Sequence, residues 1–99
     1  MTTTTWYRRR AVGDLVFIAA AIIAIIIIAH IVFVLLGANT GNDIVSTIAD
    51  WASFWATWFK GLFTPKDYKM SVFLNYGIAA VFYLIVGGIL RRILNDAFA

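Results

Sequence analysis

Hydrophobic residues form two long stretches in this chain, and polar residues gather between and outside them. The first stretch runs from Leu15 to Leu36 and is interrupted by one polar residue, His30. As a helix it would be about 33 Å long, enough to cross a hydrocarbon core of about 30 Å. A strand rarely exceeds about 10 residues, so the length favours a transmembrane helix over a buried strand.

The second stretch runs from Val72 to Leu90 and is less uniformly apolar. It would form a helix roughly 28 Å long, again close to the thickness of a hydrocarbon core. Arg91 and Arg92 follow it directly. The pattern predicts a second transmembrane helix that ends at this pair of charges.

Between the two stretches, polar residues recur every three or four positions from Asp43 to Leu62, which places them on one stripe of a helix. Asn42 is a suitable N-cap for this helix. A third transmembrane span is disfavoured, because Asp43, Asp50 and Lys60 would each cost about 2.5–3.5 kcal/mol at the bilayer centre. A narrow polar stripe opposite a broad apolar face favours a helix at the membrane interface.

The predicted fold is therefore an all-α membrane protein, a two-helix transmembrane hairpin with an interfacial amphipathic helix across its outer end. One membrane unit covers 1–99, divided into a tail (1–14), a span (15–36), the amphipathic helix (43–62), a span (72–90) and a second tail (91–99). Hydrophobic residues make up 63% of the chain and charged residues 13%, against about 45–50% and 25% in soluble domains. A cleaved signal peptide is the alternative for the first stretch, although a signal core is only about 7–15 residues long.

The distribution of Lys and Arg predicts how the hairpin is oriented. Five arginines lie on the two tails, and three lysines are spread over the segment between the spans. Because positive charge favours the cytoplasmic side, we expect both termini in the cytoplasm and the connecting segment outside the plasma membrane. The inverted topology stays open, since the lysines of the connecting segment count as well.

The apolar face of the amphipathic helix is rich in aromatic side chains, namely Trp51, Phe54, Trp55, Trp58 and Phe59. One interpretation is anchorage, because tryptophan prefers the depth of the membrane interface. A second is docking onto another membrane protein, since aromatic residues supply much of the binding energy at interfaces. A third is a role in bending or perforating the bilayer.

His30 is the polar residue inside the first apolar stretch, and an ionisable group at such depth is a functional candidate. It could serve a proton relay, ligate a metal or haem, or contact a quinone. The simpler interpretation is a hydrogen bond to Asn75 or Tyr76, which an antiparallel hairpin brings to a similar depth. A lone histidine without a second ligand is a weak signal for a metal.

Further pairs predict how the spans are held together. Asp14 opens the first span where Arg91 and Arg92 close the second, so a salt bridge can form there; independent snorkelling of the arginines is the alternative. Small residues allow close helix packing in lipid. The candidates are Ala20 and Ala24 in the first span and Gly77, Ala80 and Gly87 in the second.

Composition excludes most chemistry. The chain has no cysteine, no glutamate and one histidine, so we expect no enzymatic activity, no cofactor and no metal site. A net charge of +3 without a basic stripe argues against nucleic-acid binding. The expected partners are the lipid bilayer and other membrane-protein subunits or a second copy of the chain, with no small-molecule substrate inferred.

The segments Leu62-Phe-Thr-Pro-Lys-Asp and Leu74-Asn-Tyr-Gly-Ile-Ala-Ala resemble small two-span membrane proteins of actinobacteria that lack an assigned activity. The resemblance covers roughly the C-terminal 40 residues. It implies a plasma-membrane hairpin of a Gram-positive cell and transfers no catalytic residue.

Two functions follow as hypotheses. The first is a non-catalytic accessory subunit of a larger membrane complex, such as a respiratory assembly, because two helices cannot enclose a pathway alone. The second is a holin-like protein that permeabilises the membrane as an oligomer. The first span lacks the polar stripe that a water-filled pore would need.

Overall fold

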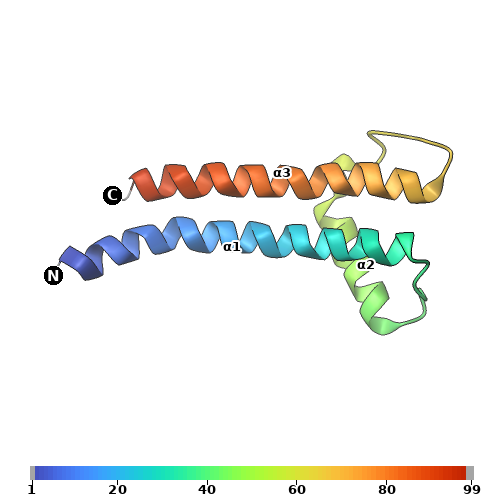
Figure 1. The fold of residues 1–99 in the computed structure, drawn as a ribbon, viewed down its shortest axis with the longest axis horizontal. Helices are drawn as coiled ribbons and strands as arrows, with labels where there is room; N and C mark the ends of the chain where they lie inside the picture. The colour runs from blue at the N-terminus through green and yellow to red at the C-terminus, as the bar shows by residue number, and fades with distance from the viewer. Residues whose placement is uncertain (1, 98–99) are drawn as a thin grey trace.

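A computed structural model describes residues 2–97 of the chain, with side chains described from Val12 onward. The elements in chain order are α1 (Thr2–Leu35), α2 (Asp43–Trp55), the 3-10 turn η1 (Thr57–Phe59) and α3 (Tyr68–Ala97). Helix makes up 81% of the structure, and residues 2–97 contain no strand. The molecule is elongated, with extents of 57 × 28 × 17 Å (Figure 1).

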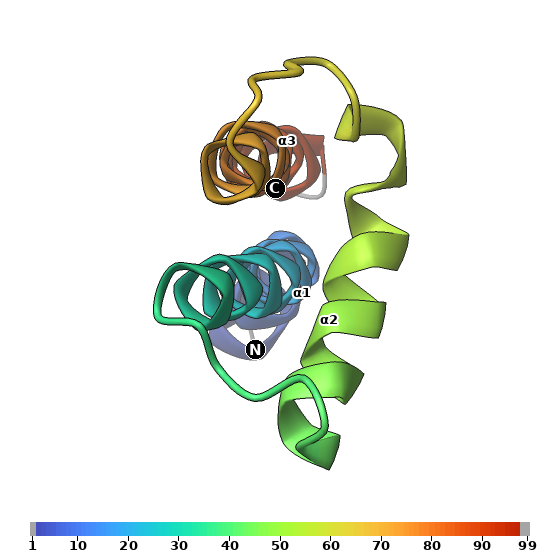
Figure 2. The same cartoon turned by 90° about the vertical axis from the view of Figure 1, so that its right-hand side faces the viewer.

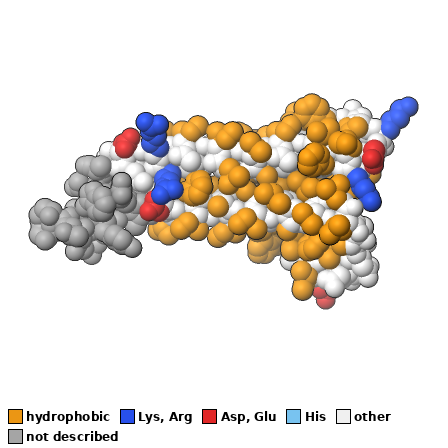
Figure 3. Space-filling model, in the orientation of Figure 1, with side chains coloured by type: hydrophobic (Ala, Val, Ile, Leu, Met, Phe, Trp, Pro, Cys, Tyr) orange, Lys and Arg blue, Asp and Glu red, His pale blue; other side chains and the backbone are white. Residues whose placement is uncertain are grey.

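The two long helices run antiparallel, side by side (Figure 1). The segments Val12–Leu35 and Tyr68–Ala97 are both long and apolar enough to cross a membrane, which confirms the all-helical class and the two apolar helices. Charged side chains gather toward the two ends of the molecule and leave an apolar band between them (Figure 3). The arginines at 8–10, on which the predicted orientation partly rests, lie outside the described side chains.

A glycine terminates α1. Gly37 adopts a φ of +68°, which a residue with a side chain rarely adopts. The amide of Ala38 donates to the carbonyl of Phe33 at 2.8 Å, and that of Gly37 to Val34 at 3.1 Å. These two bonds form a Schellman motif, which satisfies the last carbonyls of the helix and turns the chain away from its axis.

The helix α2 begins as its sequence predicts. The side chain of Asn42 accepts from the amides of Ile44 and Val45 at 2.9 and 3.3 Å, as an N-cap does. The helix ends at Trp55, short of the predicted end at Leu62. The Thr57 hydroxyl donates to the carbonyls of Ser53 and Phe54 in the last turn of α2. The chain then continues as the 3-10 turn η1.

The position of α2 differs from a helix laid across the outer end of the hairpin. It crosses one side of the α1–α3 pair (Figure 2), packs directly on α1, and reaches α3 through Trp55 and η1. The hydroxyl of Tyr83, near the middle of α3, donates to the carbonyl of Trp55 at 2.6 Å. The C-terminal end of α2 is therefore fixed about halfway along α3.

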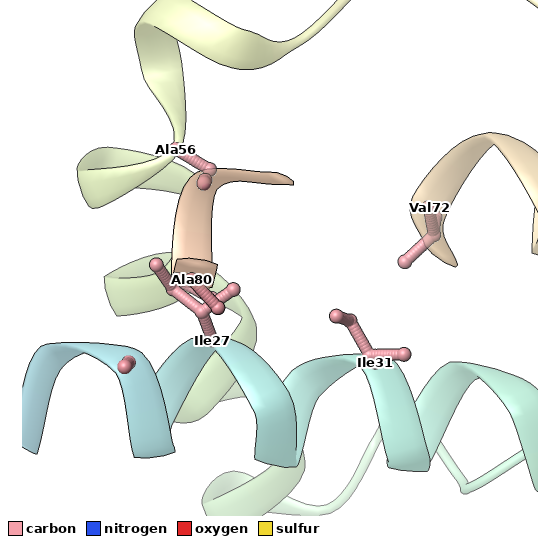
Figure 4. Packing of buried hydrophobic residues seen from close by; sticks show 8 residues of the cluster. Ile27, Ile31, Ala56, Val72 and Ala80 are labelled. Carbon is pink, nitrogen blue, oxygen red and sulfur yellow. The ribbon is translucent and has the colours of Figure 1, made fainter. Parts of the chain in front are cut away.

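A small core holds the three helices together. Ile27, on α1, is fully buried. Ala56, at the C-terminal end of α2, and Ala80, on α3, belong to the same cluster (Figure 4). Farther along α1, Ile31 and Val72 point toward one another (Figure 4). Since few side chains are buried on each long helix, most of their apolar surface faces outward.

Candidate functional site

The two long helices approach closely where Gly87 faces Ala20. A Cβ built on Gly87 would lie 2.5 Å from the Cβ of Ala20, so the contact requires glycine. Ala24 and Ala80, also predicted at helix contacts, are buried in the core. Gly77 lies apart from this seam, because a Cβ there would meet nothing within 4 Å.

A second seam of small residues joins α2 to the hairpin. Ala52 and Ala56 are completely buried and belong to the core, and the larger residues of α2 lie around them. Small side chains let helix backbones approach closely. The sequence signal for this seam is a series of alanines spaced by three and four residues from Ala49, with the more prominent aromatic residues between them.

At the end of the hairpin where the chain terminates, Arg91 Nε donates to Asp14 Oδ1 at 2.9 Å. The Arg91 guanidinium also lies over the ring of Phe17, 5.5 Å from its centroid. Of the two arginines predicted to pair with Asp14, the structure brings Arg91 to it. Within the described residues, Arg92 forms no ion pair.

His30 is buried in the hairpin, with 8% of its surface exposed. Its ring packs against the ring of Tyr76, with centroids 4.8 Å apart and planes inclined by 48°. The structure thus brings these two predicted residues together as a tilted pair of rings. No hydrogen bond among the described residues engages the imidazole, and the amide of Asn75 is directed elsewhere.

Asn75 holds the segment that leads from η1 to α3. Its Oδ1 accepts from the Phe63 amide at 2.8 Å, and its Nδ2 donates to the Phe63 carbonyl at 2.9 Å. The same Nδ2 lies 3.2 Å from Ser71 Oγ. A buried carboxamide that satisfies both backbone groups of one residue gives this irregular segment a fixed path along α3.

The aromatic residues of the predicted docking face divide into two groups. Trp55 packs edge-on against Tyr83 at 5.9 Å, and Phe59 packs on Phe82 at 5.0 Å, so both face the hairpin. The other three are largely exposed: Trp51 by 57%, Phe54 by 71% and Trp58 by 89%. We call these last three residues the exposed aromatic face.

A shallow hollow of about 450 Å³ lies beside this face. It is lined by Asp50, Trp51, Phe54 and Trp55, so one carboxylate stands among three aromatic rings. An ammonium or guanidinium group suits such a hollow, because it can pair with a carboxylate and lie over aromatic rings.

A second pocket, of about 310 Å³, lies where α1 ends beside α2 and the start of α3. Apolar side chains form most of its walls, among them Phe33, Val45 and Ala49. His30 and Lys69 contribute its nitrogen-bearing side chains. Lys69 Nζ lies 3.5 Å from the carbonyl oxygen of Leu35, a bond at the limit of hydrogen-bonding distance.

The described part of the chain holds no group of three or more His, Cys, Asp or Glu side chains that could bind a metal. Comparison with protein-family models, with characterised proteins and with solved structures finds no match. The resemblance to two-span actinobacterial proteins therefore stays a prediction. What the site offers chemically is recognition, through an aromatic surface, a carboxylate hollow and a mostly apolar pocket.

Proposed function

We propose that the chain is an integral protein of the plasma membrane and a non-catalytic accessory subunit of a larger membrane complex. The observation that carries the proposal is the exposed aromatic face, which leaves three large rings uncovered, two on α2 and one on η1. Rings of this kind supply much of the energy at protein interfaces. Both termini are proposed to lie in the cytoplasm, as the distribution of Lys and Arg predicts.

The apolar exterior of the long helices supports the membrane location. Leu15, Ile25 and Ile85 are each more than half exposed, although water would penalise such surface. The core helix of a soluble protein would be mostly buried, whereas here 28% of each apolar segment is buried. The same observation argues against the holin-like alternative, because the described outward side chains of α1 present no polar stripe to a pore.

We further propose that α2 crosses the outer leaflet and ends near the middle of the membrane instead of lying flat on its surface. Tyr83 lies about 16 Å beyond Val72 and about 10 Å before Leu90 along α3, which places the end of α2 at membrane depth. Irregular backbone at that depth must have its polar groups satisfied by protein. The bonds from Tyr83 to Trp55 and from Asn75 to Phe63 are of this kind.

The hollow at Asp50 indicates the kind of partner. A carboxylate at the edge of an apolar surface is costly unless a cation covers it. We propose that a Lys or Arg side chain of the partner enters this hollow and pairs with Asp50. The rings of Trp51 and Phe54 would flank its aliphatic stem.

Affinity purification from membranes in mild detergent, with mass spectrometry of what co-migrates, tests this function. Trp58→Ala and Asp50→Asn should each lower recovery of a stoichiometric partner. Phe73→Ala is the matched control, because Phe73 is a half-exposed ring on α3 that is not part of the exposed aromatic face. Insertion into the membrane should be unchanged in all three variants.

A photo-crosslinking amino acid at position 58 separates docking from anchorage. A protein adduct of defined mass supports the accessory-subunit proposal. Adducts with lipid alone, together with unchanged recovery in the Trp58→Ala variant, would show that the aromatic face is an anchor.

A further inference from the structure

His30 has a hydrogen-bonding capacity that the described part of the chain does not use. An imidazole carries two nitrogens that donate or accept, and this one is more than nine-tenths buried. The ring of Tyr76 packs against the imidazole of His30, and no described hydrogen bond involves the imidazole nitrogens. Among the described residues, the imidazole nitrogens are not fully buried unpaired atoms, so they are accessible to an occupant. His30 lines a pocket of about 310 Å³, and its unused hydrogen-bonding capacity points to a ligand there.

The pocket combines mostly apolar walls with four polar side chains, those of His30, Thr40, Tyr68 and Lys69. Phe33, Val34 and Val45 are among its apolar walls, while His30 and Lys69 carry its nitrogens. The Lys69 ammonium has three protons to donate, and the Leu35 carbonyl occupies at most one of them. The volume is at the lower end of the range for small-molecule sites, about 300–1,000 Å³.

We infer that this pocket binds an uncharged apolar ring that carries hydrogen-bond-accepting carbonyls, the chemistry of a quinone head group. One carbonyl oxygen accepts from the His30 imidazole and another from the Lys69 ammonium. The apolar walls enclose the ring between them. The proposal concerns binding alone and involves no electron transfer.

Other ligands fit the pocket less well. An acyl chain whose carboxylate paired with Lys69 would leave the buried imidazole of His30 against hydrocarbon, without a hydrogen bond. A phosphate head group would exchange water for walls that are mostly apolar. The site lies on α1, α2 and the start of α3, apart from the exposed aromatic face. It therefore stands whether or not α2 docks a partner.

Equilibrium binding of menadione, a naphthoquinone without a tail, to the full chain in lipid nanodiscs tests the inference. Empty nanodiscs of the same lipid correct for partition into the bilayer. We expect saturable binding of one menadione per chain. His30→Leu and Lys69→Met should each weaken the affinity by about tenfold, the effect of one lost hydrogen bond.

Matched variants separate the pocket from the rest of the surface. Lys66→Met removes a lysine that does not line the pocket, and Ser46→Phe adds a ring to an exposed position of α2; both should bind like the parent. Ala49→Phe places a ring in the pocket and should abolish binding. Circular dichroism confirms that each variant is folded.

Two results would overturn the inference. One is menadione uptake that does not saturate, or that is equal in the parent and in the folded His30→Leu and Lys69→Met variants. The other is saturable binding of oleate in place of menadione, lost with Lys69→Met and kept with His30→Leu. That outcome would identify the site as one for an anionic acyl chain.

Discussion

The hydroxyl of Tyr83 donates to the carbonyl oxygen of Trp55 at 2.6 Å and joins the end of α2 to the middle of α3. The same two residues pack ring against ring, edge to face, with centroids 5.9 Å apart. Trp55 is the last residue of α2, so its carbonyl has no partner within the helix. The bond thus completes the end of α2 and sets the depth at which that end is held.

Tyr83→Phe should loosen the attachment of α2 while keeping the ring contact. Loss of one hydrogen bond to a part-buried carbonyl should lower the free energy of unfolding by about 1 kcal/mol. Unfolding in mixed detergent micelles, followed by tryptophan fluorescence, measures this change. Tyr68→Phe is the control, because Tyr68 is exposed and no described hydrogen bond uses its hydroxyl. An equal effect of the two substitutions would contradict the role of the Tyr83 bond.

Gly87→Ala should force α1 and α3 apart. The added Cβ would lie 2.5 Å from the Cβ of Ala20, so the helices must shift, at a cost of about 1–3 kcal/mol. Gly88→Ala adds the same methyl group one residue later, where it meets nothing within 4 Å. That control should be neutral or slightly stabilising, since alanine favours helix over glycine by about 1 kcal/mol. The unfolding free energies of the two variants give the comparison.

A compensating variant makes the Gly87 prediction stricter. Ala20→Gly removes the opposing methyl group, so the double variant Ala20→Gly with Gly87→Ala should recover part of the lost stability. Residues in direct contact couple in this way, and distant ones do not. If the two single effects simply add, the close approach of these residues is not what holds the helices together.

The parts of the fold that depend on local sequence could be predicted. The long apolar stretches around Ile25 and Ile85 become helices because length alone decides between helix and strand there. Asn42 caps α2 because the bonds it makes reach only two and three residues ahead. These features need no knowledge of what packs against them.

The parts that depend on how helices are rotated against each other could not be predicted. The predicted helix 43–62 places Trp55, Trp58 and Phe59 on one apolar face, yet in the structure Trp58 alone of these is largely exposed. Which ring turns inward is set by the alanine seam and by Tyr83, far away in sequence. The sequence shows Asn75 as a polar residue in a span, but its partner Phe63 depends on the path of an irregular segment, which no local pattern specifies.

Asn75→Leu should release the segment around Phe63 from α3. The substitution keeps a similar volume and removes both bonds to the Phe63 backbone. Amide hydrogen exchange at Phe63 should then accelerate by at least about tenfold, the effect of one ordinary hydrogen bond. Asn75→Asp keeps the acceptor and loses the donor, so it should fall between the parent and Asn75→Leu.

The control for Asn75 is another asparagine that bonds to backbone. Asn39 accepts from the Gly41 amide at 2.9 Å in the turn before α2. Asn39→Ala should leave exchange at Phe63 unchanged. Protection at Phe63 that survives Asn75→Leu would mean that the path of this segment is set by other contacts.

The ion pair between Asp14 and Arg91 should contribute little to the free energy of unfolding, and its contribution should depend on salt concentration. Both side chains are about half exposed, and pairs of this kind couple by about 0.2–1 kcal/mol. A double-mutant cycle of Asp14→Asn and Arg91→Gln should give that coupling at low salt, and screening should reduce it at high salt. The matched cycle with Arg92→Gln should give no coupling.

Arg91→Gln should lower the free energy of unfolding more than Asp14→Asn does, because it also removes the guanidinium from the Phe17 ring. Equal single effects would mean that this ring contact adds nothing.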